Sequence, residues 1–241
     1  MSAGSRAVRR PRAVFFDVDF TLIYPGPTFQ GEGYRRFCAA HGIDVDPARF
    51  MEAVIAASPI LHDERQLAYD DDLFIRYTRT IIEGMGGAGD ALEACAAEIY
   101  REWAACQHFF LYDDVTPVLR ELAQGGVKVG LISNSHRSLA SFQQHFDLHG
   151  LIAGAISSSE HGFLKPHPSI FEAALRLVGV EAEESVMVGD SFPHDIEGAR
   201  RIGMRGVLVR RAEPGVSHVP PPEDVPVIRT LTELPGLLGP A

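Results

Sequence analysis

The stretch Ala13-Val14-Phe15-Phe16-Asp17-Val18-Asp19-Phe20-Thr21 decides the fold. It begins with apolar residues, which predict a short strand buried on both faces of a sheet. Two aspartates follow at once. Because successive side chains of an extended chain alternate, Asp17 and Asp19 point the same way. Two buried anions side by side need a cation or a shared proton to stabilise them, so we expect this pair to lie at the centre of the functional site.

After residue 113 the chain alternates between strand and helix patterns. The predicted strands cover residues 127–132, 155–157, 185–188, 206–209 and 225–228. The predicted helices cover residues 115–123, 139–146, 169–178, 196–202 and 231–238. Strands separated by single helices indicate βαβ units. We therefore expect an α/β fold with a Rossmann-like parallel sheet in a three-layer α/β/α core.

Residues 25–110 interrupt this pattern with a helical insert. The turn-forming residues Tyr24-Pro25-Gly26-Pro27 stop the first strand, and apolar residues then recur at three- and four-residue spacings. Asp46, followed by Pro47, is expected to cap one of the helices. No strand is expected in the insert. The predicted helices cover residues 33–40, 47–57, 63–84 and 90–105. The predicted division of the chain is a disordered tail at 1–12, a core at 13–24 and 111–241, and the insert at 25–110.

Composition excludes several classes of protein. The net charge of −10 argues against nonspecific nucleic-acid binding, which needs a basic face. No apolar run approaches the roughly 20 residues of a membrane helix, and no long apolar stretch follows the basic N-terminus as it would in a secretory signal. The 3 cysteines form no metal-binding or disulfide pattern, which is typical of a cytoplasmic protein. We expect no nucleic-acid or membrane partner, and either a monomer or a homodimer.

Polar residues stand where elements of the predicted core end. They are Asp17 with Asp19, Ser133 with Asn134, Lys165, and Asp190 with Asp195. The carboxyl ends of parallel strands meet at one edge of the sheet, where open α/β folds bind ligands. So many carboxylates need a divalent cation, and hard oxygen ligands favour Mg²⁺. A lysine and a hydroxyl beside them suit a substrate phosphate. One carboxylate could then attack phosphorus while a second moves the proton.

These residues resemble the motifs of the haloacid dehalogenase (HAD) superfamily. Asp17-Val18-Asp19-Phe20-Thr21 is similar to motif I, Ser133 to motif II, Lys165 to motif III, and Gly189-Asp190-Ser191-Phe192-Pro193-His194-Asp195 to motif IV. The order of these motifs and their positions at strand ends agree with those of the superfamily over about residues 13–210. The helical insert resembles the family's C1-type cap. The resemblance implies a hydrolase whose cap closes over the site and selects the substrate.

The resemblance also implies roles for the four acids. Asp17 would be the nucleophile and a magnesium ligand. Asp19 would be the general acid/base and would bind the metal through its backbone carbonyl. Asp190 would ligate magnesium, and Asp195 would support the metal directly or through water.

The remaining motif residues would bind or position the phosphate. By the same resemblance, Thr21 and Ser133 would bind or position the phosphoryl group, with Asn134 beside them. Lys165 would orient both Asp17 and the phosphate.

Asp19 favours one reaction class. Dehalogenases of the family lack this second aspartate and phosphonatases replace it, so its presence implies hydrolysis of phosphate esters through an aspartyl-phosphate. We predict a magnesium-dependent phosphatase for a small phosphorylated metabolite, whose identity the sequence does not give. The alternatives are a phosphomutase with the same intermediate, a 2-haloacid dehalogenase, and a non-catalytic HAD-fold binding protein. Phe20 departs from the pattern, because motif I most often has glycine at that position.

Other polar and aromatic residues have structural explanations. Tyr100 and Trp103 are expected in the core of the cap, and the acidic run 70–72 on a solvated helix face or turn. His136 is expected to be a surface or packing histidine.

Overall fold

The core of the protein is a parallel sheet with β1 near its centre. The computed structural model describes residues 10–62, 67–211 and 221–239, so most of the predicted tail at 1–12 lies outside the described residues. Six strands pair in the order β5-β4-β1-β6-β7-β8, and every pair is parallel. The predicted parallel α/β sheet is confirmed. The strands are β1 (Ala13–Phe16), β4 (Lys128–Ser133), β5 (Ile152–Ser157), β6 (Ser185–Gly189), β7 (Arg205–Val209) and β8 (Val227–Ile228).

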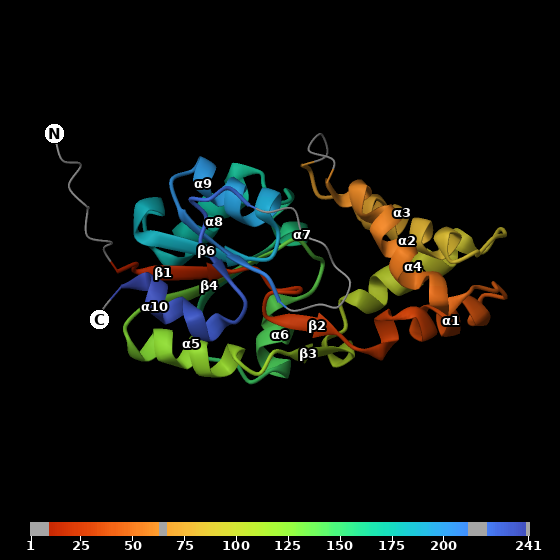
Figure 1. The fold of residues 1–241 in the computed structure, drawn as a ribbon, viewed down its shortest axis with the longest axis horizontal. Coiled ribbons are helices and arrows are strands. Elements are labelled where there is room, and N and C mark those ends of the chain that lie inside the picture. Colours follow the sequence, from red (N-terminus) through yellow and green to blue (C-terminus); the bar gives the residue numbers. More distant parts are fainter. Residues whose placement is uncertain (1–9, 63–66, 212–220, 240–241) are drawn as a thin grey trace.

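Helices cover both faces of this sheet, which gives three layers (Figure 1). Alternate residues of β1 face opposite layers, since Val14 and Phe16 belong to one apolar cluster and Ala13 and Phe15 to another. Complete burial of a side chain such as Phe16 stabilises the fold by about 2–3 kcal/mol. The first cluster packs against α5 (Val115–Gln124), α6 (Leu139–His145) and α10 (Leu234–Leu238). The second packs against α8 (Pro168–Val178) and α9 (Gly198–Arg201).

The insert is built from helices that lie beside the core (Figure 1). Asp46 caps the turn before the second helix, because its carboxylate accepts a hydrogen bond from Ala48 N at 2.9 Å. The predicted helix at 63–84 starts only at Asp71 in the described part, where Asp70 is the N-cap. Residues 63–66 of that prediction lie outside the described residues. The helices are α1 (Gly31–Ala40), α2 (Phe50–Ala57), α3 (Asp71–Gly84) and α4 (Leu92–Trp103), joined partly by the 3₁₀ turns η1 (Pro27–Phe29), η2 (Pro47–Arg49), η3 (Ser58–His62) and η4 (Cys106–His108).

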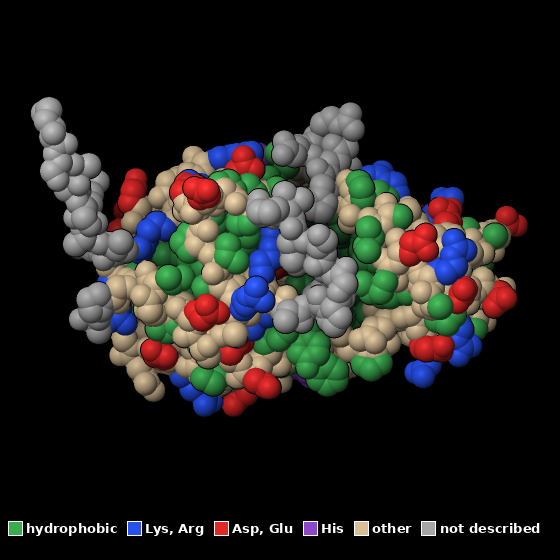
Figure 2. Space-filling view, in the orientation of Figure 1, with side chains coloured by type: hydrophobic (Ala, Val, Ile, Leu, Met, Phe, Trp, Pro, Cys, Tyr) green, Lys and Arg blue, Asp and Glu red, His purple; other side chains and the backbone are tan. Residues whose placement is uncertain are grey.

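The chain enters and leaves the insert through a small antiparallel sheet. β2 (Ile23–Pro25) pairs with β3 (Phe109–Leu111), in the register Ile23↔Leu111 and Pro25↔Phe109. We had predicted a turn at residues 24–27 and no strand in the insert at 25–110. Tyr24 and Pro25 belong instead to β2, and β3 begins inside the predicted insert, so both predictions were wrong at these residues. The two strands were missed because each pairs only with a segment far away in the sequence. Figure 2 shows hydrophobic side chains gathered in this region, where Tyr24 and Phe110 are exposed with ring centroids 5.6 Å apart.

Smaller differences from the predicted elements lie in the C-terminal half of the core. β5 begins three residues earlier than predicted. A short helix, α7 (Ser158–His161), follows it. The predicted helix at 196–202 is a π-helical turn, η6 (Phe192–Glu197), that continues into α9. The remaining 3₁₀ turns are η5 (Ala182–Glu184) and η7 (Leu231–Glu233). No helix of the described ranges is long and apolar enough to cross a membrane.

Candidate active site

Three neighbouring strands place the predicted site residues at one edge of the sheet. Asp17 follows β1, Ser133 is the last residue of β4, and Asp190 follows β6. β1 pairs in parallel with both β4 and β6, so the three carboxyl ends meet. Asp17 and Ser133 are 7% and 1% exposed. The candidate site is therefore a cluster of polar side chains, two of them buried, at the carboxyl ends of apolar strands.

Lys165 connects two of the acids. Its Nζ donates to Asp17 Oδ1 at 2.6 Å, to Asp195 Oδ1 at 2.7 Å and to the Ile132 carbonyl at 2.8 Å. These contacts use all three donors of the ammonium group. Burial alone would lower the pKa of Lys165, but the two carboxylates raise it above its usual range. The lysine is therefore a fixed cation between Asp17 and Asp195.

Asn134 holds the backbone of Lys165 in place. Its Oδ1 accepts from Lys165 N at 2.7 Å, and its Nδ2 donates to the Lys165 carbonyl at 3.0 Å. Both ends of the side-chain amide are thus used on one residue. In this arrangement Asn134 orients the lysine, and its place beside the phosphoryl group stays a prediction.

Asp17, Asp190 and Asp195 form an acidic cluster. One carboxylate oxygen from each lies within 4.8 Å of the other two. Burial raises the pKa of Asp17 to about 7, although Lys165 opposes this, and burial also raises the pKa of Asp190 well above its usual value. One lysine does not balance three carboxylates, so a divalent cation that prefers oxygen ligands fits this donor set. Gly189 makes the cluster possible, because a Cβ there would collide with the Asp195 carboxylate.

Two hydroxyl groups lie beside the acids in the sequence motifs. Thr21 is fully buried, and its Oγ1 has no hydrogen-bond partner among the described residues. Ser133 Oγ lies 2.9 Å from Ser135 Oγ. An unpartnered buried hydroxyl costs free energy, so Thr21 has a donor and an acceptor to offer a ligand.

Asp19 faces a partner that the sequence analysis missed. Nη1 of Arg137 lies 2.9 Å from Asp19 Oδ1 and 3.0 Å from Oδ2. Asp19 is not part of the acidic cluster of Asp17, Asp190 and Asp195. The two motif I aspartates therefore have different cations, Lys165 for the first and Arg137 for the second.

Phe20 occupies a left-handed backbone position. Its φ is +63°, and its N–H donates to the Ile23 carbonyl at 2.7 Å, which closes the turn between β1 and β2. This conformation favours glycine, which explains why glycine suits the position. The ring of Phe20 lies 6.3 Å from that of Trp103, at the end of α4. The departure from the motif thus adds an aromatic contact to the insert at some cost in backbone strain.

Polar side chains of the insert meet the core beside Arg137. Asp71 Oδ1 accepts from the hydroxyls of Tyr69 at 2.5 Å and Tyr100 at 2.6 Å. The ring of His136 lies 4.0 Å from that of Tyr100. Tyr100 is buried, as predicted, and the acidic run 70–72 is exposed at the start of α3, also as predicted. The hydrogen bond between Tyr100 and Asp71 was not predicted. His136 is a packing histidine, as predicted.

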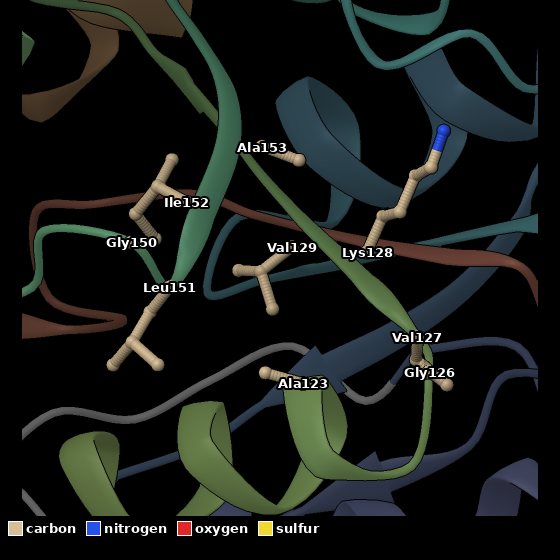
Figure 3. A pocket seen from close by; sticks show the side chains of 9 residues that line it. All are labelled: Ala123, Gly126, Val127, Lys128, Val129, Gly150, Leu151, Ile152 and Ala153. Atoms are coloured by element: carbon tan, nitrogen blue, oxygen red, sulfur yellow. The ribbon is translucent and has the colours of Figure 1, made fainter.

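A hollow in the surface lies near the amino ends of the strands, at the edge of the sheet opposite the candidate site. Figure 3 shows it between α5 and the amino ends of β4 and β5. Its lining includes Lys128 and Ile152 but no residue of the candidate site. It is therefore separate from the acidic cluster.

Comparisons with known proteins agree with the fold. The family model of the haloacid dehalogenase-like hydrolases matches residues 11–203. Haloacid dehalogenase-like hydrolase domain-containing protein 3 of Danio rerio is 28% identical over 236 residues, which cover 94% of this chain and 96% of that protein. Glyceraldehyde 3-phosphate phosphatase of Methanothermobacter thermautotrophicus is 30% identical over 239 residues, covering 94% and 99%. The structure of the HAD-hydrolase YfnB of Bacillus subtilis, bound to magnesium, shares the fold with a TM-score of 0.73 and 20% identity, covering 96% of this chain and 100% of that one. The chain belongs to the haloacid dehalogenase-like hydrolases.

Proposed function

We propose that this hydrolase is a magnesium-dependent phosphatase that acts on a small phosphorylated metabolite through an aspartyl-phosphate. The observation that carries the proposal is the pair of motif I aspartates. Asp17 is held by Lys165 at the end of β1, and Asp19 stands two residues later with a separate cation. The phosphatase name of the Methanothermobacter thermautotrophicus relative supports the same reaction class.

The acidic cluster would hold the metal. Asp17, Asp190 and Asp195 would supply carboxylate oxygens, or Asp195 would act through water, and Asp19 would add its backbone carbonyl. When bound, Mg²⁺ would offset negative charge on the phosphoryl oxygens and on the crowded carboxylates. Burial raises the pKa of Asp17 to about 7 against the opposing charge of Lys165, and a bound cation would favour the ionised form that attacks phosphorus.

In the first step an oxygen of Asp17 attacks phosphorus. A bond forms between Asp17 and phosphorus, and the bond from phosphorus to the ester oxygen breaks. The leaving oxygen takes a proton from Asp19 and departs as an alcohol. Lys165 fixes the attacking carboxylate, and Thr21 and Ser133 hydroxyls donate to the phosphoryl oxygens.

In the second step water attacks the phosphorus of the aspartyl-phosphate. Asp19, now ionised, accepts a proton from the water. The bond between Asp17 and phosphorus breaks, which releases inorganic phosphate and restores the Asp17 carboxylate. The proton cycle of Asp19 therefore closes over the two steps.

A metabolite screen tests the proposal. Purified protein with Mg²⁺ is assayed for phosphate release from sugar, amino-acid and carboxylic-acid phosphates, with Asp17→Asn as the blank. We expect at least one substrate whose turnover is abolished by Asp17→Asn and by chelation. Turnover that survives either treatment would contradict the assignment of the nucleophile or of the metal.

The same screen separates the alternative reactions. A phosphomutase would convert one sugar phosphate into an isomer without releasing phosphate. A dehalogenase would release chloride from 2-chloropropionate, which is included as a substrate. Either outcome would replace the phosphatase proposal.

A further inference from the structure

Arg137 is buried between the core and the segment that leaves the insert. Its side chain is 0% exposed, and it pairs with Asp19 through Nη1. Nη2 donates to the carbonyl of Trp103 at 2.8 Å, and the guanidinium carbon lies 4.3 Å from the centroid of the Phe109 ring. Trp103 ends α4 and Phe109 begins β3. One arginine therefore joins the second motif I aspartate to both ends of the insert's return segment, 103–109.

Arg137 has no surface left for a substrate. Its two outer nitrogens are used on Asp19 and Trp103, and an aromatic ring covers one face. The side chain of Asp19, by contrast, keeps 17% of its surface exposed. The carboxylate therefore remains accessible while the arginine behind it does not. This arrangement suits a group that acts on Asp19 and not on the substrate.

A second arginine of the chain has the same kind of surroundings. Arg211 pairs with Asp114 at 2.6 Å, donates to the Thr21 carbonyl at 2.7 Å, and lies 3.9 Å from the ring of Tyr112. Each arginine thus binds one carboxylate, one carbonyl and one aromatic face. The two carboxylates differ in function, because Asp114 has no part in the proposed proton transfer. Arg211 is therefore a matched structural control for Arg137.

We propose that Arg137 is a positioning residue for Asp19, and that it makes the alignment of this acid/base depend on the insert's return segment. The inference rests on the proposed function. A guanidinium fixed at three points restricts the rotamers of the carboxylate that it binds. Because two of those points belong to the return segment, a displacement of that segment also displaces Asp19. Proton transfer is then aligned only when the insert is seated.

The chemistry of the leaving group distinguishes positioning from general structural damage. p-Nitrophenolate leaves readily without a proton, whereas an alkoxide needs one from the general acid. The ratio kcat/KM reports the steps up to phosphoryl transfer. Misplacement of Asp19 should therefore lower kcat/KM for an alkyl phosphate far more than for p-nitrophenyl phosphate. Structural damage should lower both values by the same factor.

The experiment compares Arg137→Met, Arg137→Lys and Arg211→Met on these two substrates with Mg²⁺. The alkyl phosphate is the best one from the metabolite screen. We expect Arg137→Met to lower kcat/KM for the alkyl phosphate by about tenfold or more beyond the decrease for p-nitrophenyl phosphate. Asp19→Asn should show the same preference for p-nitrophenyl phosphate. Arg137→Lys should show a smaller difference in kcat/KM between the two substrates, because lysine keeps the positive charge but makes a single contact. Arg211→Met should lower both values equally.

Each result bears on a defined part of the proposal. Equal losses on both substrates in the Arg137 variants, with an active wild type, would overturn the positioning role and leave the phosphatase assignment intact. An inactive wild type would instead overturn the proposed function. Arg137→Lys provides the answer if Arg137→Met does not fold. Phe109→Leu removes the ring beneath the guanidinium, and an unchanged substrate ratio in that variant would overturn the link to the return segment.

Discussion

Lys165 donates to Asp17 at 2.6 Å across 148 residues of sequence. It makes a second ion pair, with Asp195, at 2.7 Å. The side chain is 2% exposed, so these two contacts and the one with the Ile132 carbonyl replace nearly all of its hydration. This lysine is thus the cation that keeps two buried acids compatible with folding.

Lys165→Met should destabilise the metal-free protein by about 3–5 kcal/mol at pH 8. The two acids would lose their common cation, and an uncompensated buried charge is costly. Urea unfolding in the presence of a chelator measures the effect. Lys128→Met is the control, because among the described residues the Lys128 ammonium makes one hydrogen bond, at 2.8 Å, to the Val178 carbonyl. A loss in Lys165→Met no greater than in this control would show that the pair is not structural.

Mg²⁺ should raise the melting temperature by several degrees. Binding to the folded state alone stabilises it by about 2.7 kcal/mol at 100 times the dissociation constant. The shift should vanish in Asp190→Asn, which removes one of the three acids of the cluster. It should persist in Asp147→Asn, an exposed position with φ +53° that asparagine accepts readily. Thermal unfolding of the three proteins with and without Mg²⁺ checks this, and an equal shift in all three would locate the ion elsewhere.

The stability of the metal-free protein should carry a pH signature of Asp17. Its pKa is 3.8 in the unfolded chain and about 7 in the folded one. Between these values the folded protein holds a proton that the unfolded chain has released, so the free energy of unfolding falls as pH rises. The decrease is at most about 1.4 kcal/mol per pH unit, and it ends above about pH 7.

Asp17→Asn isolates the contribution of Asp17 to the pH dependence of stability, since asparagine cannot ionise. Urea unfolding of both proteins from pH 4 to pH 8, with a chelator present, gives the difference in stability. The variant should gain on the wild type up to about pH 7, with no further gain above it. A difference that is constant over this range would mean that burial does not raise the pKa of Asp17.

Phe20→Gly should change stability by no more than about 1 kcal/mol. Glycine relieves the left-handed strain of about 1–2 kcal/mol, but the variant loses the contact with Trp103, which contributes about 0.5–1.5 kcal/mol. Phe20→Val should cost clearly more, because a β-branched residue tolerates φ +63° poorly and also lacks the ring. Urea unfolding ranks the two variants. A valine variant as stable as the glycine one would refute the strain at this position.

Local patterns were enough to predict the sheet and the acids. The apolar run before Asp17 marks a buried strand, and alternating elements after residue 113 require parallel neighbours, so the strand ends had to meet. Lys165 could be placed there because its loop follows the predicted strand at 155–157, and the motif resemblance supports the same position. These features depend on short stretches of sequence or on rules that hold for the whole class of fold.

Contacts between distant segments were beyond such patterns. β2 and β3 are three residues long each, and neither has enough periodicity to be recognised without its partner. Arg137 lies 118 residues from Asp19 and 34 from Trp103, and nothing beside it in the sequence marks it as buried. The left-handed φ of Phe20 depends on the turn that joins β1 to β2. In each case the environment comes from a segment that the local sequence does not specify.

The pairing of β2 with β3 brings the two ends of the insert side by side. Pro25 and Phe109 are directly opposite each other in that pair, so the two cut points lie about 5 Å apart. A two-residue hairpin turn is enough to bridge such a gap. Replacing residues 26–108 with Asn-Gly should therefore leave the parallel sheet and its acidic cluster assembled. The same two cut points would accept the insert of a relative, so an exchange of inserts would test whether this segment selects the substrate.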